Sequence, residues 1–248
     1  MLLQIIVLIV AVLLALYRVK DFRKRGLRAS AALGFALNRR SITRFIIGAA
    51  IGALAISSIF LVEWSTGLLQ IFKINAISVL REDCLYFAAK PLIEEFVFRC
   101  AILGALLLWI PQRFLAVLIA AALFGSVHIV NAHAGFLSVF STMLGGVAYG
   151  CAFLVAEQIW FPLGLHIAWN FFQARVFGFA LSGGFSGPAP LIQQHDLGPA
   201  ILTGGPYGPE GGLLGIYARF LVLGCLVAWI ICERRKFQLI AGAESSMQ

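Results

Sequence analysis

Charged residues are scarce in this chain of 248 residues. Lysine, arginine, aspartate and glutamate together make up 12% of it, about half the share in an ordinary soluble domain, whereas 61% is hydrophobic. One large soluble core is possible by length, but the number and length of the apolar runs favour lipid as the surrounding medium. We therefore expect an all-α protein, a polytopic transmembrane helical bundle with about seven to eight spans.

Other absences narrow the function further. The five cysteines form no CxxC pair and no metal-binding spacing, so we expect buried free thiols. The basic stretches lack a nucleic-acid-binding signature, so we expect no nucleic acid partner and interpret them as topology signals and anionic-lipid contacts. Segment 2–17 has no preceding positive charge and no convincing cleavage site, which indicates an uncleaved anchor rather than a signal peptide.

Seven apolar segments are close to the roughly 20 residues that cross a bilayer core. They are 2–17, 45–63, 84–110, 114–131, 136–156, 159–179 and 212–232. Segment 66–80 is ambiguous, and we interpret it as an interfacial or re-entrant helix, with an eighth span as the alternative. Two glycine pairs, Gly48 with Gly52 and Gly146 with Gly150, predict close helix approach, within the chain or between chains.

The distribution of charge predicts the orientation. With the N-terminus outside, the basic segment 18–44, the turn at Arg113 and the tail "ERRK" are all cytoplasmic, whereas the outer loop 180–211 contains no lysine or arginine. That loop is rich in glycine and proline, which predicts irregular structure. Its His195–Asp196 pair resembles a base with its orienting group, but a polar loop tip explains the pair equally well.

We treat residues 1–248 as a single integral membrane domain with a motif-bearing core at about 84–180. The expected location is a multi-pass position in the cell (inner) membrane if the source is prokaryotic. Membrane lipid and a membrane-associated peptide or protein substrate are the expected partners. The sequence sets no oligomeric state.

A few strongly polar residues lie inside the predicted spans. Such groups cost several kcal/mol in lipid unless they are paired or face a polar cavity, so each is a functional candidate. They are Lys90, Glu94, Glu95, Arg99, His128, His166, Asn170, Arg175 and Arg219.

The stretch "PLIEEFVFR" places two adjacent glutamates in one span. Glu95 and Arg99 are four residues apart, which brings them together on one helix face, whereas Glu94 is rotated by about 100°. One division of roles pairs Glu95 with Arg99 and leaves Glu94 for another neighbour, although the reverse is also reachable. Pro91 removes one backbone hydrogen bond just before them. A structural Glu–Arg pair would explain only one of the two carboxylates.

Two further segments, "FGSVH" and "HIAWN", add candidate catalytic groups. In the first, Phe124 precedes His128 by four residues, and in the second His166 and Asn170 lie one turn apart. A carboxylate with an imidazole can activate water, and an imidazole with an amide can stabilise an oxyanion. Alternatively, Glu94, His128 and His166 could form an open three-ligand zinc site.

The ordered segments "EEFVFR", "FGSVH" and "HIAWN" resemble the motifs EExxxR, FxxxH and HxxxN of the CPBP family. This family of intramembrane proteases includes CAAX prenyl proteases and bacteriocin-processing or self-immunity (Abi-type) proteins. The resemblance implies that Glu94 and His128 activate water and that His166 and Asn170 form the oxyanion site. It also implies supporting roles for Glu95, Arg99 and Phe124.

The expected activity is therefore glutamate-dependent hydrolysis of a peptide bond in a membrane-associated or prenylated, CAAX-like substrate. We favour a reaction without a cofactor, since the sequence has no HExxH motif, and zinc is the alternative. A non-catalytic membrane scaffold or self-immunity protein is a second hypothesis. A small transporter with a proton relay is a third, although the sequence shows no inverted repeat.

The depths of these residues conflict if every helix is straight. At about 1.5 Å per residue, Glu94 and His128 lie roughly 22–24 Å from the cytoplasmic ends of their spans, but His166 lies only about 10 Å from its own. A shared site therefore requires tilted helices or uneven helix ends.

Overall fold

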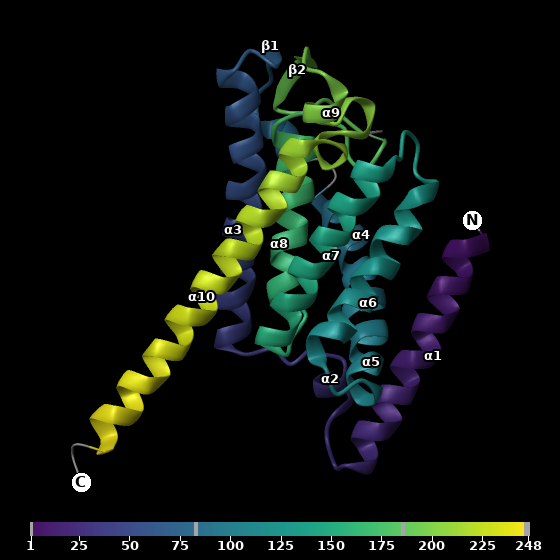
Figure 1. Ribbon diagram of the computed structural model, residues 1–248, viewed down its shortest axis with the longest axis vertical. Helices are drawn as coiled ribbons and strands as arrows, with labels where there is room; N and C mark the ends of the chain where they lie inside the picture. The colour runs from purple at the N-terminus through teal and green to yellow at the C-terminus, as the bar shows by residue number, and fades with distance from the viewer. Residues whose placement is uncertain (1, 82–83, 185–186, 246–248) are drawn as a thin grey trace.

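The computed structural model describes residues 2–81, 84–184 and 187–245, with side chains described over 6–233 of these ranges. The described chain is mostly helical (75%) (Figure 1). The α-helices are α1 (Leu2–Lys24), α2 (Ala29–Ala32), α3 (Arg39–Ser65), α4 (Cys84–Glu95), α5 (Gly104–Trp109), α6 (Arg113–Ser126), α7 (Phe136–Ala156), α8 (Trp160–Phe171), α9 (Ala200–Thr203) and α10 (Leu213–Ser245). The π-helical stretches η2 (Phe96–Leu103) and η4 (Phe172–Val176) follow α4 and α8. The 3₁₀ turns are η1 (Ile77–Arg81), η3 (Val127–Val130), η5 (Gly205–Tyr207) and η6 (Pro209–Gly211). The strands are β1 (Leu69–Ile74) and β2 (Ile192–Asp196).

Polar and apolar side chains are distributed as in a protein surrounded by lipid. Arg99 and Arg175 are among the largest fully buried side chains, and Glu95 is also fully buried. By contrast, Leu54 on α3 and Phe220 on α10 are 70% and 57% exposed. Water would favour the opposite arrangement, so this distribution and the apolar helices indicate an integral membrane protein.

Helices occupy all seven of the predicted apolar segments, but not all of them are continuous α-helices. Within the described residues, four helical stretches are long and apolar enough to cross a bilayer: Arg39–Ser65, Arg113–Val130, Phe136–Ala156 and Leu213–Glu233. The segment 84–110 is divided into α4, η2 and α5 and carries the charged motif. The mostly helical character is confirmed, whereas the count of seven to eight spans stays a prediction.

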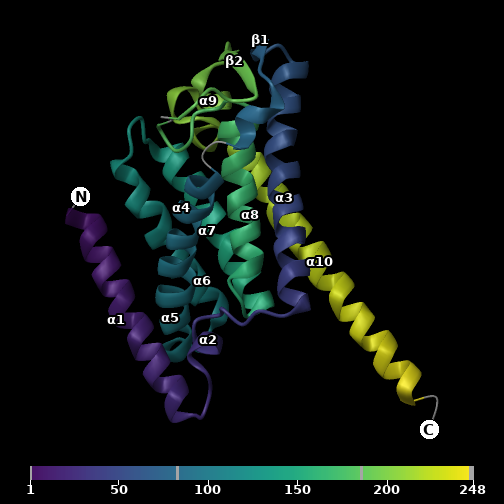
Figure 2. The ribbon, with the colours of Figure 1, turned by 180° about the vertical axis from the view of Figure 1, so that it is seen from behind.

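The two ends of the bundle differ in the way that the predicted orientation requires. The short helix α2 and the C-terminal part of α10 lie at one end, while β1, β2 and α9 lie at the other (Figures 1 and 2). The basic segments are therefore separated from the outer loop by the length of the helices. We refer to these as the basic end and the loop end.

The expected helix at 66–80 is wrong. Gly67 adopts a positive φ of 73° after α3, and the chain then forms β1 and the 3₁₀ turn η1. β1 pairs antiparallel with β2, with Gln70 opposite His195. A strand needs a partner for its backbone groups, and this partner lies more than 100 residues later in the outer loop.

The outer loop 180–211 is mostly irregular, as expected, but contains β2 and α9. Arg175 lies in η4, which follows α8. Its guanidinium donates hydrogen bonds to the backbone carbonyls of Pro188, Ala189 and Val79. This buried guanidinium thus ties the loop to the segment after β1.

Both glycine pairs pack helices within the chain. A Cβ on Gly48 or Gly52 would overlap backbone atoms of α8, and a Cβ on Gly146 or Gly150 would press against α6. The small residues therefore set the distances of α3 from α8 and of α7 from α6.

The cysteines are free, but the expectation that all are buried is wrong. Cys100 is buried, whereas Cys84, Cys225 and Cys232 are exposed. Their positions on the outer surface fit a lipid-facing location, where a thiol behaves as a small apolar group.

Substitution of Gly52 by alanine tests the α3–α8 contact. The new Cβ would overlap the carbonyl oxygen of Leu165, and the required shift should lower the free energy of unfolding by about 1–3 kcal/mol. Thermal unfolding in detergent should therefore show a lower midpoint than for wild type. Gly224→Ala on α10 is the matched control, because nothing lies within 4 Å of its Cβ position. Equal midpoints for the two variants would contradict the packing account.

Candidate active site

The four predicted catalytic residues line one small cavity. Glu94 comes from α4, His128 from η3, and His166 and Asn170 from α8. The cavity measures about 10 Å³, which is near the lower limit for one water molecule. Its other lining residues are Lys90, Phe124, Thr142, Tyr149, Ser182, Glu210 and Arg219.

The two adjacent glutamates have different surroundings. Glu95 is fully buried, and its Oε2 lies 3.2 Å from Nε of Arg99 in an ion pair. Its Oε1 lies 2.8 Å from Nδ1 of His166. Glu94 is 20% exposed, faces the cavity, and has Oε2 at 3.5 Å from Nε2 of the same histidine. The arrangement is the one in which Glu95 pairs with Arg99 and Glu94 faces another neighbour.

His166 lies between the two carboxylates and is stacked on an aromatic ring. Nδ1 donates to Glu95, since an ionised carboxylate can only accept. Nε2 faces Glu94. Because a nitrogen lone pair would repel the carboxylate oxygen, a proton is favoured on either Nε2 or Glu94. The ring of Tyr149 covers His166 at 4.6 Å with an interplanar angle of 16°. His166 thus has a fixed orientation, with Nε2 directed at Glu94.

The orientation of His128 is fixed by the helix turn that precedes it. Its Nδ1 lies 2.7 Å from the carbonyl oxygen of Phe124. Since a carbonyl oxygen only accepts, Nδ1 carries the proton and Nε2 of the neutral ring is left with a lone pair. His128 is therefore arranged to accept a proton.

Phe124 connects the histidine to the buried ion pair. The guanidinium carbon of Arg99 lies 4.6 Å from the centroid of the Phe124 ring and 5.2 Å from that of Tyr149. The Phe124 ring also contacts His128, at a centroid distance of 4.8 Å. These aromatic faces stabilise the cation without water and hold Arg99 beside Glu95.

A second buried ion pair connects the outer loop to this cavity. Nη2 of Arg219 lies 3.1 Å from Oε1 of Glu210, and Nη1 donates to the Tyr149 hydroxyl at 3.1 Å. The backbone N–H and hydroxyl of Ser182 donate to the other Glu210 oxygen, at 3.1 and 2.7 Å. The guanidinium carbon of Arg219 also lies 3.7 Å from the ring centroid of Trp169.

Sequence reasoning missed several members of this second cluster. Arg219 stands out as a charge inside an apolar span, but Tyr149 and Glu210 carry no such signal. Glu210 lies in a polar loop rich in glycine and proline, where a carboxylate is unremarkable. Only the fold brings it against Arg219.

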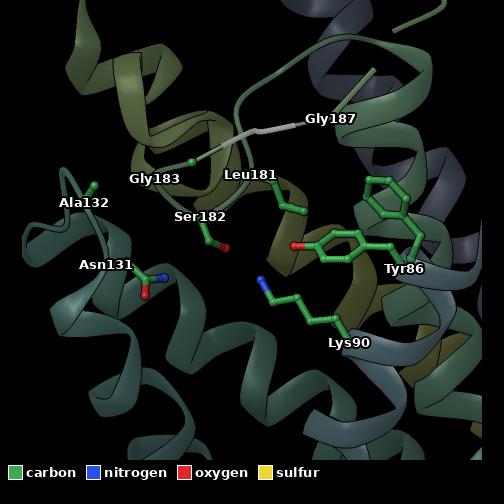
Figure 3. A pocket seen from close by; sticks show the side chains of 10 residues that line it. Tyr86, Lys90, Asn131, Ala132, Leu181, Ser182, Gly183 and Gly187 are labelled. Carbon is green, nitrogen blue, oxygen red and sulfur yellow. The ribbon is translucent and has the colours of Figure 1, made fainter. Parts of the chain in front are cut away.

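A larger pocket of about 420 Å³ adjoins the cavity at the loop end. Lys90 and Ser182 line both. In Figure 3, the ends of the Lys90 and Tyr86 side chains point toward Ser182 from α4, while Asn131 lies on the opposite wall. This larger pocket thus forms a polar vestibule beside the small cavity.

The His195–Asp196 pair lies outside this site. The ring of His195 stacks on Phe72 at 4.3 Å. Asp196 accepts hydrogen bonds from the Gly198 backbone and the Thr203 hydroxyl. Both residues therefore have structural contacts at the β1–β2 sheet.

The candidate zinc ligands are not arranged as a metal-binding group. Among the described residues, no three His, Cys, Asp or Glu side chains are placed to hold one ion. His166 faces a carboxylate on each ring nitrogen, and one ring nitrogen of His128 is bonded to a carbonyl. The described residues therefore do not fit a zinc ion at this site.

Comparison with known proteins identifies the region that holds these residues. Residues 83–172 match a family model described as Type II CAAX prenyl endopeptidase Rce1-like. This confirms, over that range, the resemblance to CPBP-family intramembrane proteases and supports a peptidase of the CAAX protease type. No curated protein and no solved structure matched the chain. The match includes Glu94 through Asn170 but not Glu210 or Arg219.

Variants of Arg99 and Glu94 should show that the carboxylates of Glu95 and Glu94 contribute differently to stability. Arg99→Met leaves Glu95 buried without its cation and should lower the free energy of unfolding by about 3–5 kcal/mol. Glu94→Gln removes a partly exposed carboxylate that pairs with no arginine or lysine of the described side chains, so stability should change little. Thermal unfolding of both purified variants checks this difference. Similar losses of stability in the two would show that the glutamates are not divided in this way.

A pH titration of stability should report on Glu210, which lies outside the membrane-spanning helices. Burial alone would raise the pKa of its carboxyl, but Arg219 and the Ser182 donors lower the pKa below its ordinary value of 4.5. A lowered pKa in the folded state contributes stability above pH 4.5 and loses it as the pH falls further. Wild type should therefore be more stable than Glu210→Gln at neutral pH, with the difference shrinking below about pH 4.5.

Glu157→Gln is the control for this titration. Glu157 is 74% exposed, so its substitution should leave both stability and its pH dependence close to wild type. A difference between wild type and Glu210→Gln that stays constant down to strongly acid pH would contradict the ionised Glu210–Arg219 pair.

Proposed function

We propose that this protein is an intramembrane endopeptidase that hydrolyses a peptide bond in a membrane-associated or prenylated, CAAX-like substrate. One observation carries the proposal: Glu94, His128, His166 and Asn170, from three helical segments, line a single cavity. The match of residues 83–172 to a type II CAAX prenyl endopeptidase model supports the reaction class.

In the proposed reaction, water is the nucleophile. Glu94 and His128 both line the cavity, and either the Glu94 carboxylate or Nε2 of His128 can accept the proton that water loses as its oxygen attacks the peptide carbonyl carbon. The cavity is near the size of one water, which favours a single positioned nucleophile. Transfer of a proton to a positioned base contributes typically 10²–10⁴-fold to such a rate.

The developing oxyanion would be stabilised by His166 and Asn170. An N–H on Nε2 of His166 and the side-chain amide of Asn170 are one helical turn apart and line the same cavity. The carbon–nitrogen bond then breaks, the amine leaves with a proton returned from the base, and the other product is a carboxylate. Glu95 would hold Nδ1 of His166, so that its Nε2 donor stays directed at the reaction.

Glu95, Arg99 and Phe124 are assigned positioning roles. Glu95 contacts both His166 and Arg99, and Phe124 packs against Arg99 and His128. None of these three needs to touch the substrate. Their common effect would be to keep both histidines in fixed orientations.

The substrate would enter from the loop end through the 420 Å³ pocket. The small cavity is near the size of one water molecule, whereas the adjoining vestibule measures about 420 Å³. Lys90, which lines both spaces, would place a positive charge beside the bound chain. Ser182, held by Glu210, would form the wall between them.

We also propose that the reaction needs no metal ion. The described residues support this, because no three of their His, Cys, Asp or Glu side chains are placed to hold one ion. Metal analysis of purified, active protein tests the proposal, and one bound zinc ion per chain would overturn it.

Comparative mass spectrometry of membrane peptides tests the activity without knowledge of the substrate. New peptide ends should be present in wild-type membranes and absent with Glu94→Ala or His128→Ala, because each variant lacks a proposed proton acceptor. His195→Ala is the control, since this histidine lies outside the cavity and should leave the peptide ends unchanged. All variants should be checked for expression and thermal unfolding. Wild-type peptide ends with a folded Glu94→Ala protein would favour a non-catalytic role.

A further inference from the structure

A second cavity, of about 640 Å³, lies at the basic end of the bundle. It is bounded by α1 and α2, the first turn of α3, α5, the start of α6 and the end of α7. The views in Figures 1 and 2 place α2 at the end opposite the β1–β2 sheet, so this cavity is separate from the candidate active site. We call it the arginine pocket.

The arginine pocket has an excess of positive charge. Arg18, Arg40, Arg44 and Arg113 line it, against Glu157 as the one acidic lining residue. Arg113 pairs with Glu157 at 3.6 Å, and both are exposed. The charges of the other three arginines are left without an acidic partner among the lining residues.

Arg18 is the buried member of this group. Its side chain is 7% exposed, and Nη1 donates to the carbonyl oxygen of Cys100. Nε has no hydrogen-bond partner among the described residues. A Cβ at position 104 would overlap the guanidinium, so Gly104 provides the space that Arg18 occupies. A buried cation with an unpartnered N–H is costly unless an anion reaches it.

Arg44 and two helix ends add to the positive field. Nη1 of Arg44 donates to the carbonyl of Ala156 at 2.9 Å, which holds this guanidinium at the cavity. Arg40 lies in the first turn of α3, and Arg113 is the first residue of α6. Both helices therefore direct their positive N-terminal ends toward this region.

The rest of the wall is apolar, and this identifies the kind of anion. Phe22, Leu107, Leu108, Phe153 and Leu154 line the same cavity. A free inorganic ion would gain nothing from these side chains, whereas a lipid would place its glycerol and upper acyl chains against them. The basic end is also the end that the positive-inside rule assigns to the cytoplasmic leaflet, where anionic lipids attract arginines.

We propose that the arginine pocket binds the phosphate group of an anionic phospholipid. Arg18, Arg40 and Arg44 bind the phosphate oxygens, since guanidinium groups match phosphate geometry. The apolar wall contacts the lipid below its head group. Binding at this site is independent of the proposed peptidase activity.

Lipid titration of the full-length protein in a neutral detergent, followed by native mass spectrometry, tests the proposal. The double variant Arg40→Gln/Arg44→Gln removes two pocket charges and keeps the buried Arg18, whose loss would endanger folding. The matched control is Arg28→Gln/Arg39→Gln, which removes two nearby arginines that do not line the pocket. Thermal unfolding confirms that each protein is folded.

The expected result is that phosphatidylglycerol binds wild type and the control alike. The pocket variant should bind it at least about tenfold more weakly, because two charge-assisted contacts are lost. Phosphatidylcholine, which has a phosphate but no net charge, should bind more weakly than phosphatidylglycerol. Equal phosphatidylglycerol affinity in the pocket and control variants would overturn the site. Displacement of the lipid by millimolar inorganic phosphate would show that the pocket takes a free anion instead.

Discussion

The arrangement of the site depends on one buried ion pair, that between Glu95 and Arg99. A carboxylate with no exposed surface, inside an apolar bundle, is stable only if a cation and hydrogen-bond donors surround it. Arg99 supplies the cation at 3.2 Å and His166 the donor at 2.8 Å. Phe124 and Tyr149 enclose the guanidinium. Because Glu95 meets these structural demands, Glu94 is free to face the cavity, and the proposed catalysis rests on this division.

A second buried pair repeats this arrangement at the loop end. Glu210 and Arg219 join the outer loop to α10, and the Tyr149 hydroxyl accepts from the same arginine. Tyr149 therefore contacts both clusters, with its ring on His166 and its oxygen on Arg219. The loop that covers the cavity and the histidine inside it are held by one continuous network. Such coupling makes loop position part of the active-site geometry.

Local spacing predicted the proximity of the polar residues better than it predicted the overall architecture. The four-residue separations of Glu95 from Arg99 and of His166 from Asn170 follow from helix geometry, and the structure brings these residues to one cavity. The expected mismatch in depth arose from treating every span as a straight α-helix. The π-helical stretch η2 follows directly after Glu95, and His128 lies in the 3₁₀ turn η3. The strand at 69–74 and the contact of Glu210 depend on long-range partners, which no local pattern reveals.

The central claim is that Glu94 activates water to cleave a peptide bond. The most direct measurement is peptide hydrolysis by purified protein reconstituted in vesicles, carried out in oxygen-18-labelled water and followed by mass spectrometry. The substrate is a peptide whose cleavage in wild-type membranes has been identified. Wild type should form a new carboxyl terminus carrying one labelled oxygen, and folded Glu94→Ala protein should form essentially none. Equal product from the two proteins would contradict it.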